Sequence, residues 1–268
     1  MMRSLENKTA AIFAANGEIS SAVARAMAER GAYVYLSGRN LSAVSQLAEQ
    51  ITAAGGLAEV HHVDATDEQQ IDSFLQHIVA ERGAIDIVFN GIGLRVHEAT
   101  YGTPATQLSF DKFMLPLHII LGSQFLTARV AARHMMAAKS SGTIITLTAS
   151  LSRIKIPFMA GITAACAGVE GLTRSLAAEF GPSGIIVICL NPTALVDTRT
   201  IRETNAANAQ AAGVPEEQFA EQLRQGYLLG RSPSTQHIGT LAAFLATEEG
   251  ALLNSHVVDA DFGAYSVI

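Results

Sequence analysis

Three polar side chains follow the β-branched run Thr143–Thr148 and are close enough in the chain to act together. They are Ser150, Arg153 and Lys155. A serine beside a fixed cation can bind a carboxylate or polarise a carbonyl group. We expect them to face a ligand, and four further side chains are candidates for the same space: His97, Tyr101, His118 and Asp197. The alternative for each, an ordinary loop or surface side chain, stays open.

A second group of candidates consists of small residues after the first β-branched run. Asn16, Gly17 and Ser20 lie between that run and an amphipathic stretch. Dinucleotide sites need small residues here, because backbone N–H groups at a helix N-terminus must approach the pyrophosphate. The alternative is a plain turn capped by Asn16 and Gly17.

The elements that must position these residues alternate regularly between strand and helix patterns. Pro116 should end or kink the first part of the longest predicted helix. This alternation predicts an α/β fold with right-handed crossovers and a doubly wound parallel sheet, in one domain over residues 1–268. The expected strands are Thr9–Ala15, Ala32–Ser37, Ala58–Val63, Ile85–Asn90, Thr143–Thr148, Ile185–Leu190 and Val257–Ala260. The expected helices are Ser20–Arg30, Leu41–Ala54, Glu68–Arg82, Phe110–Ala138, Ile162–Phe180 and Ile238–Ala246, with a polar helical excursion over Thr200–Gln225 broken near Gly213–Pro215.

Composition narrows the class of protein. Hydrophobic residues make up 49% and charged residues 16% of the chain, which suits a sheet buried beneath helices on both faces. The net charge of −6 and the lack of a basic run disfavour nucleic acid and anionic membranes as partners. No signal-peptide pattern or long uninterrupted apolar run is present, so we expect a soluble cytoplasmic protein.

The two cysteines, Cys166 and Cys189, lie far apart and lack metal-ligand spacing. We expect reduced, buried thiols and predict no metal site. Cys166 lies among small residues that indicate tight helix packing, so a buried thiol is favoured over a nucleophile.

Several segments together resemble the short-chain dehydrogenase/reductase family, from the first strand to Gly263. Each is a weak match alone, but their order and spacing are jointly specific. The resemblance implies a single Rossmann-type domain that binds a nicotinamide dinucleotide at the carboxyl ends of its strands. The segments are Gly171–Ile185, Asp86–Gly93, Asp64–Asp67, Leu229–Pro233, Ala243–Ala246 and Val258–Gly263.

The resemblance assigns the cofactor site but shows departures within it. The family's three loop glycines fall on Ala14, Glu18 and Ser20, and a carboxylate at position 18 would repel a pyrophosphate unless it turns outward. Arg39 follows the second strand, where the family often holds the 2′-phosphate of NADP, so NADP is expected rather than NAD. A solvated arginine at a helix entrance is the alternative. The predicted cofactor residues are Ala14, Asn16, Gly17, Ser20, Arg39, Asp64, Asn90, Gly91 and Pro192, with Thr193 in place of the family's glycine after Pro192.

The family's catalytic positions depart further. Its acid/base tyrosine falls on Ile162, and the lysine four residues later falls on Cys166. Neither side chain can replace the original, because isoleucine carries no exchangeable proton and a thiol supplies no fixed cation. The serine position falls on Ala149, beside Ser150, and His118 is the polar candidate in the region of the family's helix asparagine. Ser150 and His118 are therefore the predicted catalytic residues.

Two functions stay open at this point. The first is an NADP-dependent oxidoreductase that acts on a small organic carbonyl or alcohol through a non-standard site. The second is a protein of the same fold without redox activity: a cofactor-independent enzyme, a binding module or an inactive partner subunit.

The apolar character of the helices near 110–138 and 162–180, which pack against neighbours in the family, also predicts a homodimer or homotetramer. The motif Tyr227-x-x-x-Arg231 carries little weight, because it lies in the C-terminal region.

Overall fold

The sheet contains all of the predicted strands. A computed structural model describes residues 4–95, 98, 102–155 and 157–264. Seven parallel strands form one sheet in the order β3-β2-β1-β4-β5-β6-β7, which confirms the doubly wound, Rossmann-like prediction. The strands are β1 (Thr9–Phe13), β2 (Tyr33–Gly38), β3 (Leu57–His62), β4 (Ile87–Asn90), β5 (Gly142–Leu147), β6 (Ile185–Pro192) and β7 (Val257–Ala260).

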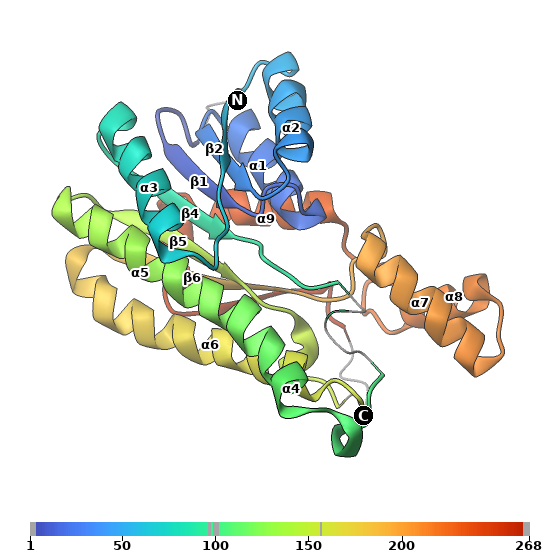
Figure 1. The fold of residues 1–268 in the computed structure, drawn as a ribbon. Coiled ribbons are helices and arrows are strands. Elements are labelled where there is room, and N and C mark those ends of the chain that lie inside the picture. The colour runs from blue at the N-terminus through green and yellow to red at the C-terminus, as the bar shows by residue number, and fades with distance from the viewer. Residues whose placement is uncertain (1–3, 96–97, 99–101, 156, 265–268) are drawn as a thin grey trace.

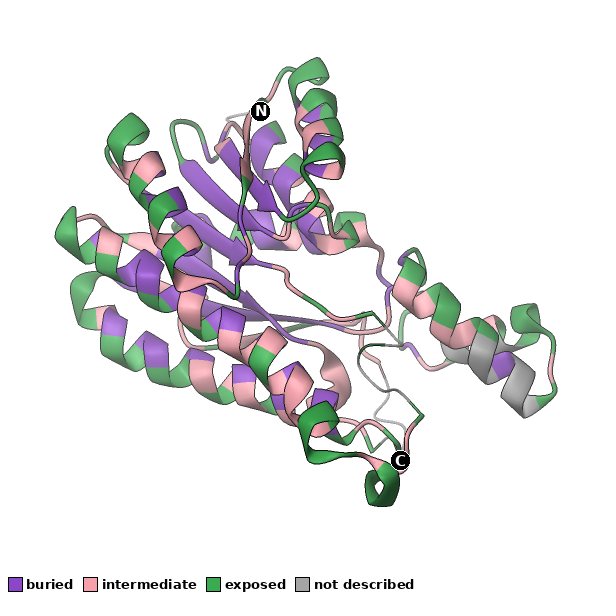
Figure 2. Cartoon of the chain, in the orientation of Figure 1, coloured by how far each residue is buried: buried purple, intermediate pink, exposed green. Residues whose placement is uncertain are grey.

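Helices cover both faces of the sheet (Figure 1). Strand β1 shows the two-sided burial: Ala10 and Ile12 pack into one core, while Ala11 and Phe13 pack into the other. Figure 2 shows the buried strands between helices whose outer faces are exposed. This burial on both faces explains why central strands such as β1 and β4 are mostly apolar instead of alternating. One face carries α1 (Glu18–Glu29), α2 (Leu41–Ala53) and α9 (Thr235–Leu245), and the other carries α3 (Glu68–Arg82), α5 (Gly122–Ala137) and α6 (Ala160–Phe180).

Pro116 marks a change of helix type, as predicted. The α-helical segment α4 (Phe110–Pro116) ends there, a π-helical turn covers Leu117–Leu121, and α5 follows without a break. Proline has no N–H to donate to the preceding turn, which favours an irregularity at this point. Short π-helical turns of this kind occur frequently at functional sites.

The helical stretch Phe110–Ala137 is long and apolar enough to cross a bilayer by length and composition. Its buried side packs on the sheet, however, with Ala128, Val130 and Ala131 fully inaccessible to solvent. We therefore describe it as a core helix of this fold.

The polar excursion forms two helices, α7 (Arg199–Ala212) and α8 (Glu216–Gln225). They form a hairpin that projects away from the sheet (Figure 1). Gly213 adopts a φ of 67°, the left-handed region that glycine tolerates best, and turns the chain between them. The predicted interruption near Gly213–Pro215 is confirmed.

Buried polar side chains from α5 tie together the ends of the two central strands. The Gln124 Nε2 donates to the carbonyl oxygens of Asn90 (2.9 Å) and Leu147 (3.3 Å), the last residues of β4 and β5. The Asn90 Nδ2 donates to the hydroxyls of Ser123 (3.2 Å) and Thr127 (3.1 Å), and its Oδ1 accepts from the Ile92 N–H (2.9 Å). Every one of these polar groups is buried or half-buried, so the network fixes where both strands end.

Replacing Asn90 with alanine should destabilise the protein, because the half-buried Ile92 N–H loses its acceptor and two buried hydroxyls lose their donor. We expect a loss of about 2–4 kcal/mol in the free energy of unfolding, measured by urea denaturation. Asn205→Ala on the projecting α7 is the control, with an expected change below about 0.5 kcal/mol. An Asn90→Ala protein as stable as the control would show that the network does not hold the strand ends.

Candidate functional site

The first loop at the carboxyl edge of the sheet runs from β1 into α1. Ala14, at the first family glycine position, adopts a φ of 51°. The backbone thus keeps the left-handed conformation that a glycine would adopt more easily. For an alanine this conformation costs about 1–2 kcal/mol. Gly17 is the N-cap of α1 and offers no side-chain cap, which leaves the N–H groups of the first turn available to an anion.

Ser20, at the third family glycine position, lies in that first turn and packs against Gly91. A Cβ on Gly91 would come within 2.0 Å of the Ser20 Oγ, so only glycine fits beside it. Ser20 is 1% exposed, and its Oγ has no hydrogen-bond partner among the described residues. A buried, unpaired hydroxyl in the first turn of a helix suits a site that binds phosphate oxygens.

Glu18 turns away from the helix that it begins. Its Oε2 accepts a hydrogen bond of 2.8 Å from the Arg199 N–H, and its Oε1 lies 3.6 Å from the Arg202 guanidinium. Both partners belong to the first turn of α7. The carboxylate is therefore neutralised by α7, and the expected repulsion of a pyrophosphate is largely removed.

Arg39 and Asp64 meet beyond the ends of β2 and β3. The Arg39 guanidinium lies 3.8 Å from the Asp64 Oδ2, with 78% of the arginine side chain exposed. Burial would raise the pKa of Asp64, but hydrogen bonds from the Thr66 hydroxyl and N–H, together with the charge of Arg39, lower it. An ionised carboxylate and an exposed guanidinium thus stand at the position predicted for the adenosine end.

Two further predicted cofactor residues line the same edge. The Asn16 Oδ1 lies 2.9 Å from the position that a Cβ on Gly38 would occupy, so Asn16 covers the carboxyl end of β2. The Asn90 side chain is committed to the network with Ser123, Thr127 and Ile92. Asn90 therefore contributes to this site by holding the end of β4 in place.

The positions assigned to tyrosine and lysine are apolar. Ile162 and Cys166 are 5% and 2% exposed, and they belong to a cluster with Ile120, Val169 and Cys189. The Thr148 hydroxyl donates to the Cys166 carbonyl oxygen at 3.1 Å. Burial raises the pKa of the Cys166 thiol, which supports the interpretation of an inert thiol.

Hydroxyl groups gather next to this apolar cluster. Ser150, in the 3₁₀ turn Ser150–Ser152 after β5, donates to the Thr193 Oγ1 at 3.5 Å. The Tyr227 hydroxyl lies beside Thr193 and donates to the Ala194 carbonyl oxygen at 3.4 Å. Burial, together with the charge of Asp261, raises the pKa of Tyr227, so this phenol keeps its proton at neutral pH. Tyr227 carried little weight in the sequence. It lies far along the chain from Ser150, so no local pattern indicated that the two hydroxyls come close in the fold.

Three of the other predicted candidates, His118, Lys155 and Asp197, share no side-chain hydrogen bond with these hydroxyls. His118 is exposed in the π-helical turn and its imidazole shares no hydrogen bond with another described residue, so the structure does not join it to Ser150. The Asp197 carboxylate caps α9 by accepting from the N–H (2.8 Å) and hydroxyl (2.7 Å) of Thr235. Lys155 is exposed, and His97 and Tyr101 lie outside the described residues.

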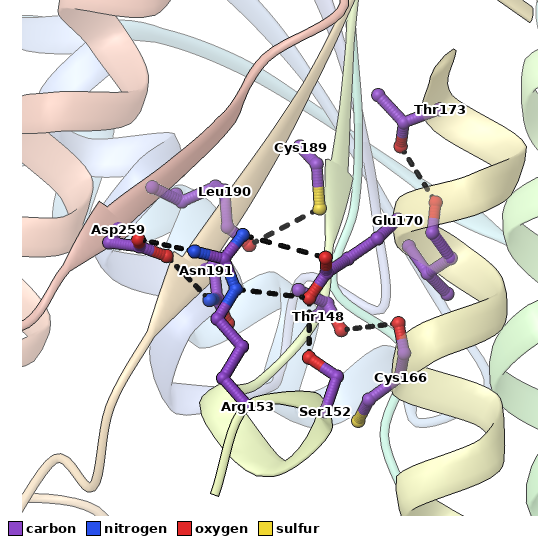
Figure 3. Close-up of polar contacts among 11 residues, drawn as sticks. Thr148, Ser152, Arg153, Cys166, Glu170, Thr173, Cys189, Leu190, Asn191 and Asp259 are labelled. Carbon is purple, nitrogen blue, oxygen red and sulfur yellow. Dashed lines mark hydrogen bonds and ion pairs between the residues drawn. The ribbon is translucent and has the colours of Figure 1, made fainter. Parts of the chain in front are cut away.

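Arg153 is held by two carboxylates and is not free to bind a ligand (Figure 3). Its Nη1 donates to the Asp259 Oδ2 on β7 at 2.6 Å, and its Nη2 lies 3.4 Å from the Glu170 Oε2 on α6. Ser152 also donates to Glu170, and Asn191 donates to Asp259 at 2.7 Å. Arg153 thus anchors the loop that carries Ser150 to α6 and to the edge strand.

Comparisons with known proteins match nearly the whole chain. A family model described as enoyl-(acyl carrier protein) reductase matches residues 14–265. An uncharacterized oxidoreductase, YxbG, from Bacillus subtilis is 29% identical and covers 98% of this chain and 92% of its own. Tropinone reductase-like 2 from Erythroxylum coca is 30% identical over the same shares. The solved structure of an NAD⁺-bound xylitol dehydrogenase superimposes with a TM-score of 0.87 at 20% identity, covering 97% of this chain and 99% of its own.

The two buried thiols provide a direct test of the apolar cluster. Burial raises the pKa of Cys189 to about 12 and also raises that of Cys166, so both stay protonated near neutral pH, and the thiolate fraction grows only as the pH rises. We expect Ellman's reagent at pH 8 to modify neither cysteine in the folded protein and both after unfolding in guanidinium. Fast labelling of Cys166 in the folded protein would contradict the assignment and would indicate a nucleophilic thiolate.

Proposed function

Because the chain belongs to the short-chain dehydrogenase/reductase family of oxidoreductases, we propose that it is a cytoplasmic, NADP-preferring reductase of a small organic carbonyl compound. The observation that carries this proposal is the position of Glu18, whose carboxylate is bound to α7 and leaves the first turn of α1 to a pyrophosphate. The uncapped N–H groups of that turn and the unpaired Ser20 hydroxyl support the same site.

The preference for NADP rests on Arg39. A 2′-phosphate presents several acceptor oxygens, and a guanidinium binds them with charge-assisted hydrogen bonds. Arg39 is exposed and only loosely paired with Asp64, so it can turn toward a phosphate without losing a buried partner. Asp64 then stays at the adenine side, as the family resemblance implies.

The chemistry of reduction needs a proton for the substrate oxygen, while bound NADPH supplies the hydride. The Ser150 hydroxyl is the proton donor of this proposal, and Thr193 lies between it and the protonated Tyr227 phenol. Ser150 would donate to the developing alkoxide, and Thr193 and then Tyr227 would replace that proton once their hydroxyls have rotated away from the acceptors they have in the structure. Solvent would return the proton to the Tyr227 phenolate after the product leaves. The apolar surface of Ile162 and Cys166 excludes water beside this chain of hydroxyls.

One observation favours the second function. Ile162 and Cys166 fill the acid/base positions with a closed apolar cluster, and positioned proton transfer alone is worth about 10²–10⁴ in rate. A redox-inactive protein of the same fold, acting as a cofactor-independent enzyme, a binding module or an inactive partner subunit, is therefore the alternative to the reductase.

We also propose that the protein is a homodimer or homotetramer through α4, α5 and α6. Phe110, Phe125 and Met136 support this, because they expose large apolar side chains on α4 and α5. Such residues are commonly covered by a second copy.

Arg39→Ala should weaken NADPH binding by about 10–100-fold while leaving NADH binding unchanged, because the change removes charge-assisted bonds to the 2′-phosphate alone. Isothermal titration calorimetry with each nucleotide measures both values. Arg25→Ala is the matched control, since Arg25 is exposed on α1 and bonds Gln50 instead. Equal affinities of the wild-type protein for NADPH and NADH would contradict the NADP assignment.

Tyr227→Phe and Ser150→Ala should each lower kcat for carbonyl reduction by about 10²-fold or more and leave NADPH affinity intact, because each interrupts the hydroxyl chain without touching the phosphate site. Loss of Tyr227 should also move the alkaline limb of the pH–rate profile. The control is Ser183→Ala, on the exposed turn before β6. If the wild-type protein binds NADPH but reduces no member of a broad carbonyl panel, the reductase proposal fails and the redox-inactive alternative stands.

A further inference from the structure

A cluster of three metal-ligating side chains lies at the edge of the sheet, on the β3 and α3 side. Glu59 and His61 are two residues apart on β3, so their side chains point to the same face of the strand. His77 reaches the same point from α3. Strand β3 is the outermost strand of the sheet, and the three side chains are 22–40% exposed.

The donor atoms of the cluster converge on one place. The Glu59 Oε1 lies 2.8 Å from the His61 Nε2 and 3.0 Å from the His77 Nε2, and all three atoms lie within 4.8 Å of one another. The two imidazole rings have centroids 4.8 Å apart. Both histidines thus direct the same ring nitrogen to a single carboxylate oxygen at hydrogen-bond distance. Small rotations of these side chains would place all three atoms about 2.0–2.2 Å from one ion.

Neighbouring side chains hold this geometry. The Phe74 ring packs against His61 with centroids 5.1 Å apart, and the Tyr35 ring lies 6.0 Å from His61 and 6.2 Å from His77. The Tyr33 hydroxyl lies 3.5 Å from the Glu59 Oε2, the oxygen that the histidines leave free. Side chains that contact the metal ligands without touching the ion orient those ligands and strengthen metal binding.

A pocket of about 550 Å³ opens beside the cluster. It gives a bound ion room for a water molecule or another small ligand in addition to the three protein ligands. Among the residues that line it are His61, His62, Asp67, Gln70, Ser73 and His77.

We propose that Glu59, His61 and His77 form a binding site for one divalent transition-metal ion, with Zn²⁺ as the preferred ion. Two imidazoles and one carboxylate suit zinc and its neighbours in the first transition series, whereas Mg²⁺ and Ca²⁺ prefer oxygen ligands throughout. The ion would bridge β3 and α3 and fasten the edge strand to the helix beside it. This site lies outside the hydroxyl chain, and the inference does not rest on the proposed reductase activity.

Calorimetric titration of the untagged, metal-free protein with ZnCl₂ tests the proposal, and titration with CoCl₂ adds the visible d–d absorption of protein-bound Co²⁺. We expect one equivalent of Zn²⁺ per chain. At a Zn²⁺ concentration of about 100 times Kd, the Tm should rise by about 5–10 °C, because the ion binds only the folded state.

His77→Ala and His61→Ala should each weaken Zn²⁺ binding by more than about tenfold. Removing a side chain that only supports a metal ligand already lowers metal affinity by about 10–100-fold. Glu59→Gln is the second variant: it keeps a hydrogen-bond acceptor beside both imidazoles, so it should fold while still losing affinity. His256→Ala is the control, because the imidazole of this exposed histidine bonds the Asn254 carbonyl, away from the cluster, and its loss should leave binding unchanged. Absence of stoichiometric binding, or binding that survives both His77→Ala and Glu59→Gln, would overturn the proposal.

Discussion

Gln124 donates from one amide nitrogen to the carbonyl oxygens that end β4 and β5, and the position of the ligand crevice expected at the carboxyl edge of this fold depends on this contact. Parallel strands deliver their loops to one edge, but the loops face a common space only if neighbouring strands end together. Gln124 and the Asn90 amide impose that condition from inside the core. Because all of these groups are buried, an alternative ending of either strand would leave polar atoms unpaired at a cost of about 1–3 kcal/mol each.

From those strand ends, the crevice divides into two chemically different halves. On the side of β1, β2 and β3, backbone N–H groups, Ser20 and Arg39 present donors suited to phosphate. On the side of β5 and β6, an apolar cluster surrounds Ile162 and Cys166, and the polar chemistry is carried by hydroxyls instead of a cation. The Arg153 ion pairs fix the loop between these features, so Ser150 is held by contacts to α6 and β7 instead of by a ligand.

The sequence was sufficient for the fold because its signals are local. Alternating β-branched and amphipathic runs predicted every strand of the sheet, and Pro116 and Gly213 predicted where helices change or break.

The site was predicted less completely because its decisive contacts are long-range. The bond between Glu18 and the Arg199 N–H spans 181 residues, and no pattern near either residue indicates it. Gln124 and Thr127 lie in an apolar helix, where isolated polar residues give no periodic signal. Tyr227 reaches Thr193 from a different region of the chain.

A crystal structure of the protein soaked with saturating NADP tests the central claim most directly, namely that this edge still holds a dinucleotide at its adenosine side. The account predicts the pyrophosphate on the first turn of α1 with the Ser20 hydroxyl as a partner. It also predicts the 2′-phosphate against Arg39, with Glu18 still bound to α7. A crevice that stays without nucleotide at saturation, or one in which the Glu18 carboxylate occupies the pyrophosphate position, would contradict it.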